Sequence, residues 1–243
     1  MKCDVLVISA HPDDAELSCS GTVKDLTNRG QSVVFVDCTA GELGTRGSAE
    51  LRAQEAAEAA RILGVAHREC LHMTDGAVAH TQENILKIVE VLRAYTPRIV
   101  LTTPPLERHP DHEAVHRLVR AATFLSGLQK VATRRHGVPQ EPHRPDRTLC
   151  FMQQFDLPGG PDFYVDITST YPDRLASIKA FASQFHMPET YQADEPETFL
   201  SRPAFFEELE ARCLYFGSRI GVRYAEAFKS VEPLGLRSLA DLL

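Results

Sequence analysis

The sequence lacks several features that would place it in common classes of protein. Its 243 residues carry a formal net charge of −7, so there is no basic excess that would attract nucleic acid or an anionic membrane. The six cysteines form no C-x-x-C pair and lie mostly in apolar runs, which is typical of buried, reduced thiols. The first apolar run covers only residues 5–10, too short for a membrane span or a signal peptide. We therefore expect a cytoplasmic protein without a nucleic-acid or membrane partner.

Apolar runs of strand length alternate with stretches of helical periodicity. The runs CDVLVISA, SVVFVDC, HRECLHM and RIVLTT are followed by helical patterns over residues 15–29, 49–63, 82–95 and 112–129. Because these runs are continuously apolar rather than alternating, they predict parallel strands that are covered on both faces. We expect an α/β fold with three layers, Rossmann-like, in which helices lie on both faces of a mostly parallel sheet.

The rest of the chain is expected to complete the same domain, which would span residues 1–243 with a core at 1–130 and additional elements at 148–243. Residues 131–147 are basic and rich in proline, and they predict an exposed loop. Further strands are expected at TLCFMQQF, DFYVDI and RYAEAFKS, with helices over residues 172–185 and 203–218 and a polar loop over 187–199.

The first predicted strand ends on His-Pro-Asp-Asp, residues 11–14. This position is the carboxyl end of a parallel strand, where open α/β sheets bind their ligands. Histidine and aspartate suit zinc or a similar divalent ion, and adjacent aspartates on a turn point in different directions. One of them can therefore bind metal while the other removes a proton from a water molecule. Alternatively, one aspartate caps the next helix, which would leave the rest of the motif unexplained.

A second copy of His-Pro-Asp follows the fourth predicted strand, at residues 109–111, and His112 comes directly after it. Two such turns can converge on one ion that keeps an open position for water. The same stretch reads HEAVH at residues 112–116, which matches the H-E-x-x-H motif of zinc peptidases. We interpret this match as fortuitous because it leaves the first motif unused and places His112 at the start of a helix. His116 is then expected to be a packed or solvent-facing helix residue.

Together, AHPDDAE and RHPDH resemble the zinc-dependent N-acetylglucosaminyl deacetylase superfamily, also called PIG-L/LmbE-like. The segments GELGTRGSAELRAQEAAEAARILGV, SGLQK, IKAFASQF and IGVRYAEAF resemble more particularly its bacillithiol-biosynthesis branch, which deacetylates N-acetylglucosaminyl L-malate. The resemblance implies hydrolysis of the acetamide of a small sugar conjugate, with one Zn²⁺ or another divalent metal per subunit. It also implies a homo-oligomer, with hexamers among the relatives.

The resemblance further implies a role for each residue of the two motifs. Asp13 would be the base that deprotonates the attacking water. His109 would stabilise the oxyanion and protonate the leaving amine, and Asp111 would hold that histidine in orientation. The implied metal ligands are His11, Asp14 and His112.

A malate conjugate carries two carboxylates, so its binding would need cationic donors. Arg52 matches an arginine that grips the substrate in relatives, and Gln184 matches a polar residue of the site. Arg46 and Arg108 are further candidates because they lie close to the motifs in sequence. Two alternatives remain open: Arg52 pairs with glutamates of its own helix on the surface, and Gln184 merely ends a helix.

Other functions fit parts of the sequence. A deacetylase for another N-acetylglucosamine conjugate or for a chito-oligosaccharide would keep the same site but would gain little from arginines. A non-catalytic zinc-stabilised binding protein would tolerate the loss of Asp13. A dinucleotide-binding oxidoreductase is disfavoured, because the first strand-to-helix turn lacks G-x-G-x-x-G and places carboxylates where a pyrophosphate would bind.

Overall fold

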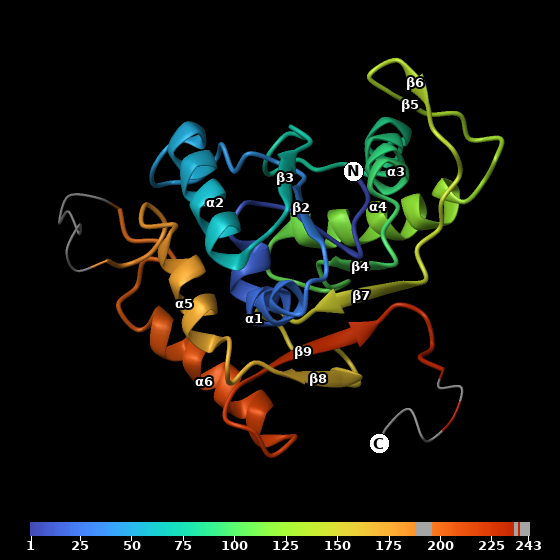
Figure 1. The fold of residues 1–243 in the computed structure, drawn as a ribbon. Coiled ribbons are helices and arrows are strands. Elements are labelled where there is room, and N and C mark those ends of the chain that lie inside the picture. Colours follow the sequence, from blue (N-terminus) through green and yellow to red (C-terminus); the bar gives the residue numbers. More distant parts are fainter. Residues whose placement is uncertain (188–195, 236–237, 239–243) are drawn as a thin grey trace.

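A seven-stranded sheet with helices packed on both of its faces forms the centre of the protein (Figure 1). This computed structural model describes residues 1–187, 196–235 and 238. The first half contains β1 (Val5–Ser9), α1 (Asp14–Asn28), β2 (Val33–Asp37), α2 (Ala49–Leu63), β3 (His67–Cys70), α3 (Gln82–Tyr95), β4 (Ile99–Thr102) and α4 (Pro110–Ser126). The second half contains β5 (Arg134–Arg135), β6 (Val138–Pro139), β7 (Arg147–Phe151), β8 (Phe163–Asp166), α5 (Tyr171–Lys179), α6 (Phe205–Ser218) and β9 (Ala225–Ser230).

Parallel pairing dominates the sheet, whose strand order is β3-β2-β1-β4-β7-β9-β8. In β1, Val5 pairs in parallel with Val33 of β2 on one side and with Ile99 of β4 on the other. The parallel pairing continues from β2 to β3 and from β4 to β7, whereas β9 runs antiparallel to both β7 and β8. The expected α/β fold with a mostly parallel sheet is therefore confirmed.

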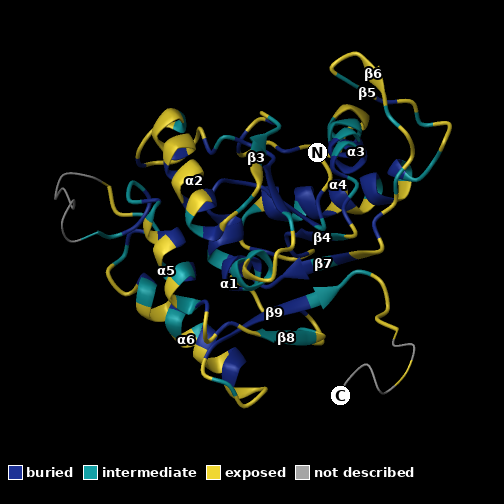
Figure 2. Ribbon diagram, viewed as in Figure 1, coloured by how far each residue is buried: buried dark blue, intermediate teal, exposed yellow. Residues whose placement is uncertain are grey.

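The central strands are continuously apolar because both faces of the sheet are buried (Figure 2). Leu6 and Ile8 of β1 belong to one core, which includes the apolar sides of α3 and α4. Val5 and Val7 of the same strand belong to a second core with apolar residues of α1. Successive side chains of a strand point to opposite faces, so in a strand that is covered on both sides every residue is buried and apolar residues follow one another.

Residues 131–147, expected to be a plain exposed loop, contain a short hairpin. Strands β5 and β6 pair antiparallel, and the two residues between them, His136 and Gly137, have φ values of 51° and 79°. Left-handed conformations at both positions are typical of the two-residue type I′ turn. Arg135 of the hairpin donates to Glu69 of the edge strand β3 at 2.8 Å. The expectation was wrong here because a two-residue hairpin depends on turn conformation and not on apolar periodicity.

The helix expected over residues 172–185 ends early, at Lys179 in α5. Beyond it, the backbone N–H of Ser183 donates to the Glu55 carboxylate of α2 at 2.7 Å. Phe181 and Phe185 are fully buried in a cluster with residues of α2 and α6. These tertiary contacts replace the last helical turn. Of the polar loop expected over residues 187–199, residues 188–195 lie outside the described part of the chain.

The cysteines and the helices bear on two expectations from composition. All six cysteines are free; Cys70 is partly exposed and the other five are buried, which confirms the expected buried thiols. Among the helices that the structure describes, none combines the length and the apolar character needed to cross a lipid bilayer.

Candidate active site

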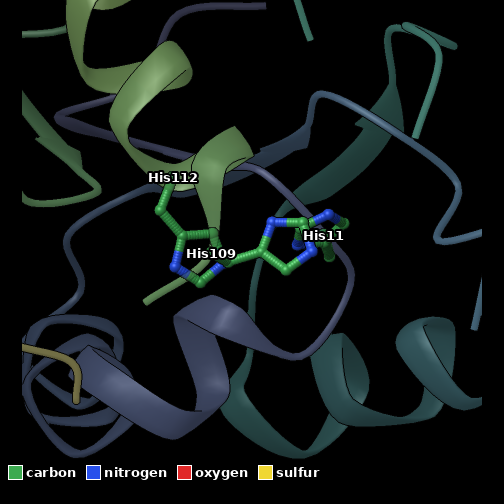
Figure 3. A group of neighbouring side chains, drawn as sticks. All are labelled: His11, His109 and His112. Carbon is green, nitrogen blue, oxygen red and sulfur yellow. The ribbon is translucent and has the colours of Figure 1, made fainter. Parts of the chain in front are cut away.

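The two His-Pro-Asp motifs meet at the carboxyl ends of the neighbouring strands β1 and β4. The first motif forms the turn between β1 and α1, and the second lies at the start of α4, the helix that follows β4 after a short loop. The ring centroid of His11 lies 4.6 Å from that of His109 and 5.4 Å from that of His112 (Figure 3). The two motifs are far apart in the sequence, and the parallel pairing of the two strands brings them together.

Asp14 lies between the two histidines that the sequence predicts as metal ligands. Its Oδ2 atom is 3.5 Å from Nδ1 of His11, and its Oδ1 atom is 3.1 Å from Nε2 of His112. All three residues are buried. Within the described residues, neither ring nitrogen of His112 has a partner in hydrogen-bond geometry. Two imidazoles and one carboxylate form a donor set that suits zinc, and the unsatisfied nitrogens of His112 fit a cation at this place.

His109 offers an alternative third nitrogen. Ligand atoms of His11, His109 and His112 all lie within 4.8 Å of one another. His109 also caps α4, because its Nδ1 atom accepts the backbone N–H of Asp111 at 3.2 Å. Burial and the neighbouring His11 and His112 lower the pKa of His109. Because Nδ1 accepts the N–H of Asp111, it carries no hydrogen itself, and Nε2 is the ring nitrogen that can donate.

Two carboxylates lie close to the same ring nitrogen of His11. Nε2 of His11 lies 3.0 Å from Oδ1 of Asp75 and 3.4 Å from Oδ2 of Asp111. A carboxylate on one ring nitrogen fixes the tautomer and leaves the other nitrogen for a metal. The carboxylate of Asp111 faces His11 and accepts the backbone N–H groups of Gly76 and Val78, so Asp111 contacts His109 through its backbone N–H and not through its carboxylate. This N–H donates to Nδ1 of His109 and so orients the ring toward the start of α4.

Asp13 is buried beside a guanidinium. Its backbone φ is 108°, in the left-handed region that non-glycine residues rarely adopt. Such strain is found mainly at functional sites, where surrounding contacts hold it in place. Oδ2 of Asp13 accepts a hydrogen bond from Nη2 of Arg52 at 2.6 Å. Burial raises the pKa of Asp13, although Arg52 opposes this. Its side chain makes no capping bond to α1, so the capping alternative does not apply to this residue.

Arg52 is buried rather than exposed, which excludes the surface pairing considered from the sequence. Only 7 % of the residue is accessible. Besides Asp13, its Nη2 atom donates to the backbone oxygen of Pro12 at 2.8 Å, and Nη1 donates to that of Gly41 at 3.3 Å. Glu55, one of the glutamates considered as a partner, binds Ser183 instead. Arg52 therefore ties α2 to the turn that carries the first motif.

A cavity of about 320 Å³ opens over these residues, and Arg52, Arg108 and Gln184 are among the residues that line it. The guanidinium carbon of Arg108 lies 4.4 Å from the ring centroid of Phe199, which is also in the lining. The amide of Gln184 donates to the backbone oxygen of Arg46 at 2.8 Å. Arg46 itself is buried. The structure thus places three of the four predicted substrate-binding residues at the cavity.

Two residues at the site were missed by the sequence analysis. Asp75 follows β3, and the rule that parallel strands end at one edge of the sheet could have indicated it. Gln153 follows β7 and donates from Nε2 to Oδ1 of Asp14 at 3.1 Å, and no motif marks it. The surroundings of His116 do not support the alternative zinc-peptidase motif. That residue is buried, with Nδ1 3.1 Å from the backbone oxygen of Thr103, which confirms that it is a packed helix residue.

A buried cluster of histidines and carboxylates under an open cavity, at the carboxyl edge of a parallel sheet, is typical of a metal-dependent hydrolase. Comparison with protein families matches residues 6–123 to PIG-L, described as GlcNAc-PI de-N-acetylase. The diacetylchitobiose deacetylase of Thermococcus kodakarensis is 31 % identical and aligns with 96 % of this chain and 84 % of its own length. The chain belongs to the PIG-L family, and it is an enzyme of the amide-hydrolase class.

Other relatives carry different activities in their names. The 4-oxalmesaconate hydratase of Pseudomonas putida is 27 % identical over 97 % of this chain and 92 % of its own length. A probable N-acetyl-alpha-D-glucosaminyl L-malate deacetylase 2 of Bacillus anthracis is 25 % identical over 87 % of this chain and 94 % of its own. Among solved structures, a conserved protein from Thermus thermophilus has a TM-score of 0.84 at 35 % identity and covers 98 % of both chains.

Proposed function

We propose that this protein is a zinc-dependent deacetylase that hydrolyses the acetamide of an N-acetylglucosamine conjugate. The observation that carries the proposal is the convergence of His11, Asp14 and His112 beside a buried, ion-paired Asp13. A family relative that acts on diacetylchitobiose supports the substrate class. The proposed metal ligands are these two histidines and Asp14, while His109 is reserved for the chemistry of the substrate.

Each remaining group has a task in amide hydrolysis. His11, Asp14 and His112 would hold the zinc ion, which would lower the pKa of water to about 7 and polarise a carbonyl oxygen. Asp13 takes a proton from the attacking water at a carboxylate oxygen, while Arg52 favours the ionised form of that carboxylate and holds it in place. As the water oxygen bonds to the carbonyl carbon, Nε2–H of His109 donates to the oxygen that becomes negative. Cleavage of the carbon–nitrogen bond then releases acetate, and the proton goes to the glucosamine nitrogen.

The contacts of the arginines favour a neutral sugar over malate as the other part of the conjugate. The malate prediction relied on three arginines, but Arg52 is ion-paired with Asp13 and Arg46 is buried. Arg108 lines the cavity with its guanidinium beside the ring of Phe199. Among the described residues that line the cavity, Arg108 is the one cation that is not paired with a carboxylate, and one cation matches a dicarboxylate poorly. We therefore place a chito-oligosaccharide first and N-acetylglucosaminyl L-malate second.

The test is primary-amine release by the zinc-loaded protein from N,N′-diacetylchitobiose, N-acetylglucosaminyl L-malate and free N-acetylglucosamine, assayed side by side. We expect the disaccharide to be preferred and Arg108→Met to leave its turnover within a few-fold. Preference for the malate conjugate, lost in Arg108→Met, would restore the malate assignment. Absence of amine release from all three, together with hydration of an unsaturated dicarboxylate, would replace the deacetylase proposal with a hydratase.

We also propose that the enzyme acts as a homo-oligomer in the cytoplasm. The six free thiols agree with a reducing compartment. Sedimentation of the purified protein tests the assembly: a hexamer of the 27.0 kDa chain is expected, and a monomer at micromolar concentration would refute it.

A further inference from the structure

Gln153 places its side-chain amide against the Asp14 carboxylate, although it comes from the opposite half of the chain. Its Nε2 atom donates to Oδ1 of Asp14 at 3.1 Å, and the residue is 9 % exposed. The other carboxylate oxygen, Oδ2, accepts the backbone N–H of His11 at 2.9 Å. Among the hydrogen bonds of the described residues, each oxygen of Asp14 accepts from one donor, and Gln153 supplies one of the two.

Chemistry fixes the orientation of this amide. An ionised carboxylate can only accept hydrogen bonds, so the nitrogen of Gln153 must face Asp14 and the oxygen must face away. The Oε1 atom is buried and has no hydrogen-bond partner within the described residues. Gln153 borders a side pocket of about 60 Å³ that also reaches His109 and His112. Among the described contacts, the bond to Asp14 is therefore the one that orients the side chain of Gln153.

The backbone that carries Gln153 is held from two sides. Arg212 of α6 donates from Nη1 to the backbone oxygen of Gln153. Oε2 of Glu107 accepts the backbone N–H of Gln154 at 2.7 Å and that of Phe155 at 3.3 Å. Glu107 precedes His109 by two residues, so the same contacts join this segment to the second motif. A support of this kind keeps a side chain in place before any ligand binds.

We propose that Gln153 is a positioning residue of the metal site: its amide holds Asp14 in the orientation that presents the carboxylate to a cation together with His112. The inference rests on the metal site of the proposed function and adds a residue that no motif indicated. Hydrogen-bond partners of metal ligands typically change metal affinity by about 10- to 100-fold when they are removed.

The test measures zinc affinity without any sugar substrate. Metal-free wild type, Gln153→Leu and Gln153→Met compete with a chromophoric chelator for zinc, and their cobalt-substituted forms are compared by visible absorption. Neither substitution leaves a donor for Asp14, and methionine keeps the length of the side chain. We expect both variants to bind zinc about 10- to 100-fold more weakly and to show an altered cobalt spectrum. Thermal unfolding of the metal-free proteins is expected to remain within a few degrees of wild type.

Gln154→Leu is the matched control, because Gln154 lines the same side pocket but its side chain accepts from Arg212 at 3.0 Å. This variant is expected to retain wild-type zinc affinity. Zinc affinity within twofold of wild type and an unchanged cobalt spectrum in both Gln153 variants would overturn the inference. Weaker zinc binding in a protein that deacetylates none of the sugars would support the inference and overturn the proposed function. Failure of the wild type to bind zinc would overturn both.

Discussion

Asp13 shows most clearly how single side chains are prepared for chemistry at this site. It combines a left-handed backbone, almost complete burial and a 2.6 Å contact with Arg52. The two motifs predicted that the histidines and aspartates would gather, because the carboxyl ends of parallel strands share one edge of the sheet. They could not predict that Arg52 binds Asp13 or that Asp111 faces His11. Such contacts depend on side-chain directions that only the folded chain determines.

The variant Arg52→Lys distinguishes between two roles for the arginine, which are to position Asp13 and to bind the substrate. Lysine keeps the charge but loses the planar fork that reaches Asp13 and the backbone oxygen of Pro12 together. We expect kcat to fall by about 10- to 100-fold, because the base is displaced, while KM stays within about twofold. Steady-state kinetics on the preferred substrate is the measurement. A raised KM with unchanged kcat would show instead that Arg52 grips the substrate.

Asp4 gives a prediction for the pH dependence of stability away from the site. Its carboxylate accepts the backbone N–H and the hydroxyl of Ser32, both at 2.8 Å, and these bonds lower the pKa of Asp4. A lowered pKa in the folded state stabilises the fold above the unfolded pKa of about 3.9, and this stabilisation is lost as the pH falls through the folded pKa. Asp4→Asn is expected to lower the free energy of unfolding at pH 7 by about 1 kcal/mol.

Urea midpoints at pH 7 and near pH 3 check this expectation. The difference between wild type and Asp4→Asn should shrink at the lower pH, because pH 3 lies below the unfolded pKa of about 3.9 and the stabilisation from the lowered folded pKa is being lost there. A difference of the same size at both pH values would contradict the assigned role of the carboxylate.

At the scale of helices and strands, apolar periodicity predicted the elements of the core well. The continuous run of β1 and the helical pattern of α1 appear close to where they were expected, because burial on both faces imposes the pattern. The hairpin β5–β6 and the early end of α5 were missed. The hairpin depends on two residues in the left-handed conformation. The end of α5 depends on a hydrogen bond from the N–H of Ser183 to Glu55, which lies on another helix.

Close packing of α1 against the segment after β8 leads to a prediction at Gly21. A Cβ atom there would lie 2.8 Å from the side chain of Ile167. Gly21→Ala is expected to destabilise the fold by about 1–3 kcal/mol from overpacking, although alanine favours a helix by about 1 kcal/mol. Urea unfolding compares it with Glu58→Ala, which removes the exposed ion pair with Arg61 and should leave the urea midpoint close to that of wild type. Wild-type or greater stability of Gly21→Ala would refute the close contact.

For the whole molecule, the sheet joins the two halves of the chain. β7 extends the parallel core through β4, and β9 and β8 follow at the same edge. We propose that residues 1–130 and 148–243 form one domain, because the candidate site also draws on both halves through Asp14 and Gln153. The alternation of strands and helices predicted the class of fold. The order of strands beyond β4 follows from long-range pairing that no local pattern encodes.

This proposal predicts one cooperative unfolding transition. Far-UV and near-UV circular dichroism should report the same midpoint, and the calorimetric and van't Hoff enthalpies should agree. Two resolved transitions, with the second half of the chain melting separately, would contradict a single domain.

The most direct test of the central claim is acetate release from N,N′-diacetylchitobiose by wild type and Asp13→Asn at equal, measured zinc occupancy. We expect equal amounts of acetate and free amine from the wild type, because one amide is hydrolysed for each acetate. In Asp13→Asn, kcat should fall by about 100-fold or more, since the asparagine amide cannot accept the proton of the water. Turnover of the variant within twofold of wild type, at full zinc occupancy, would contradict the assignment of Asp13 as the base.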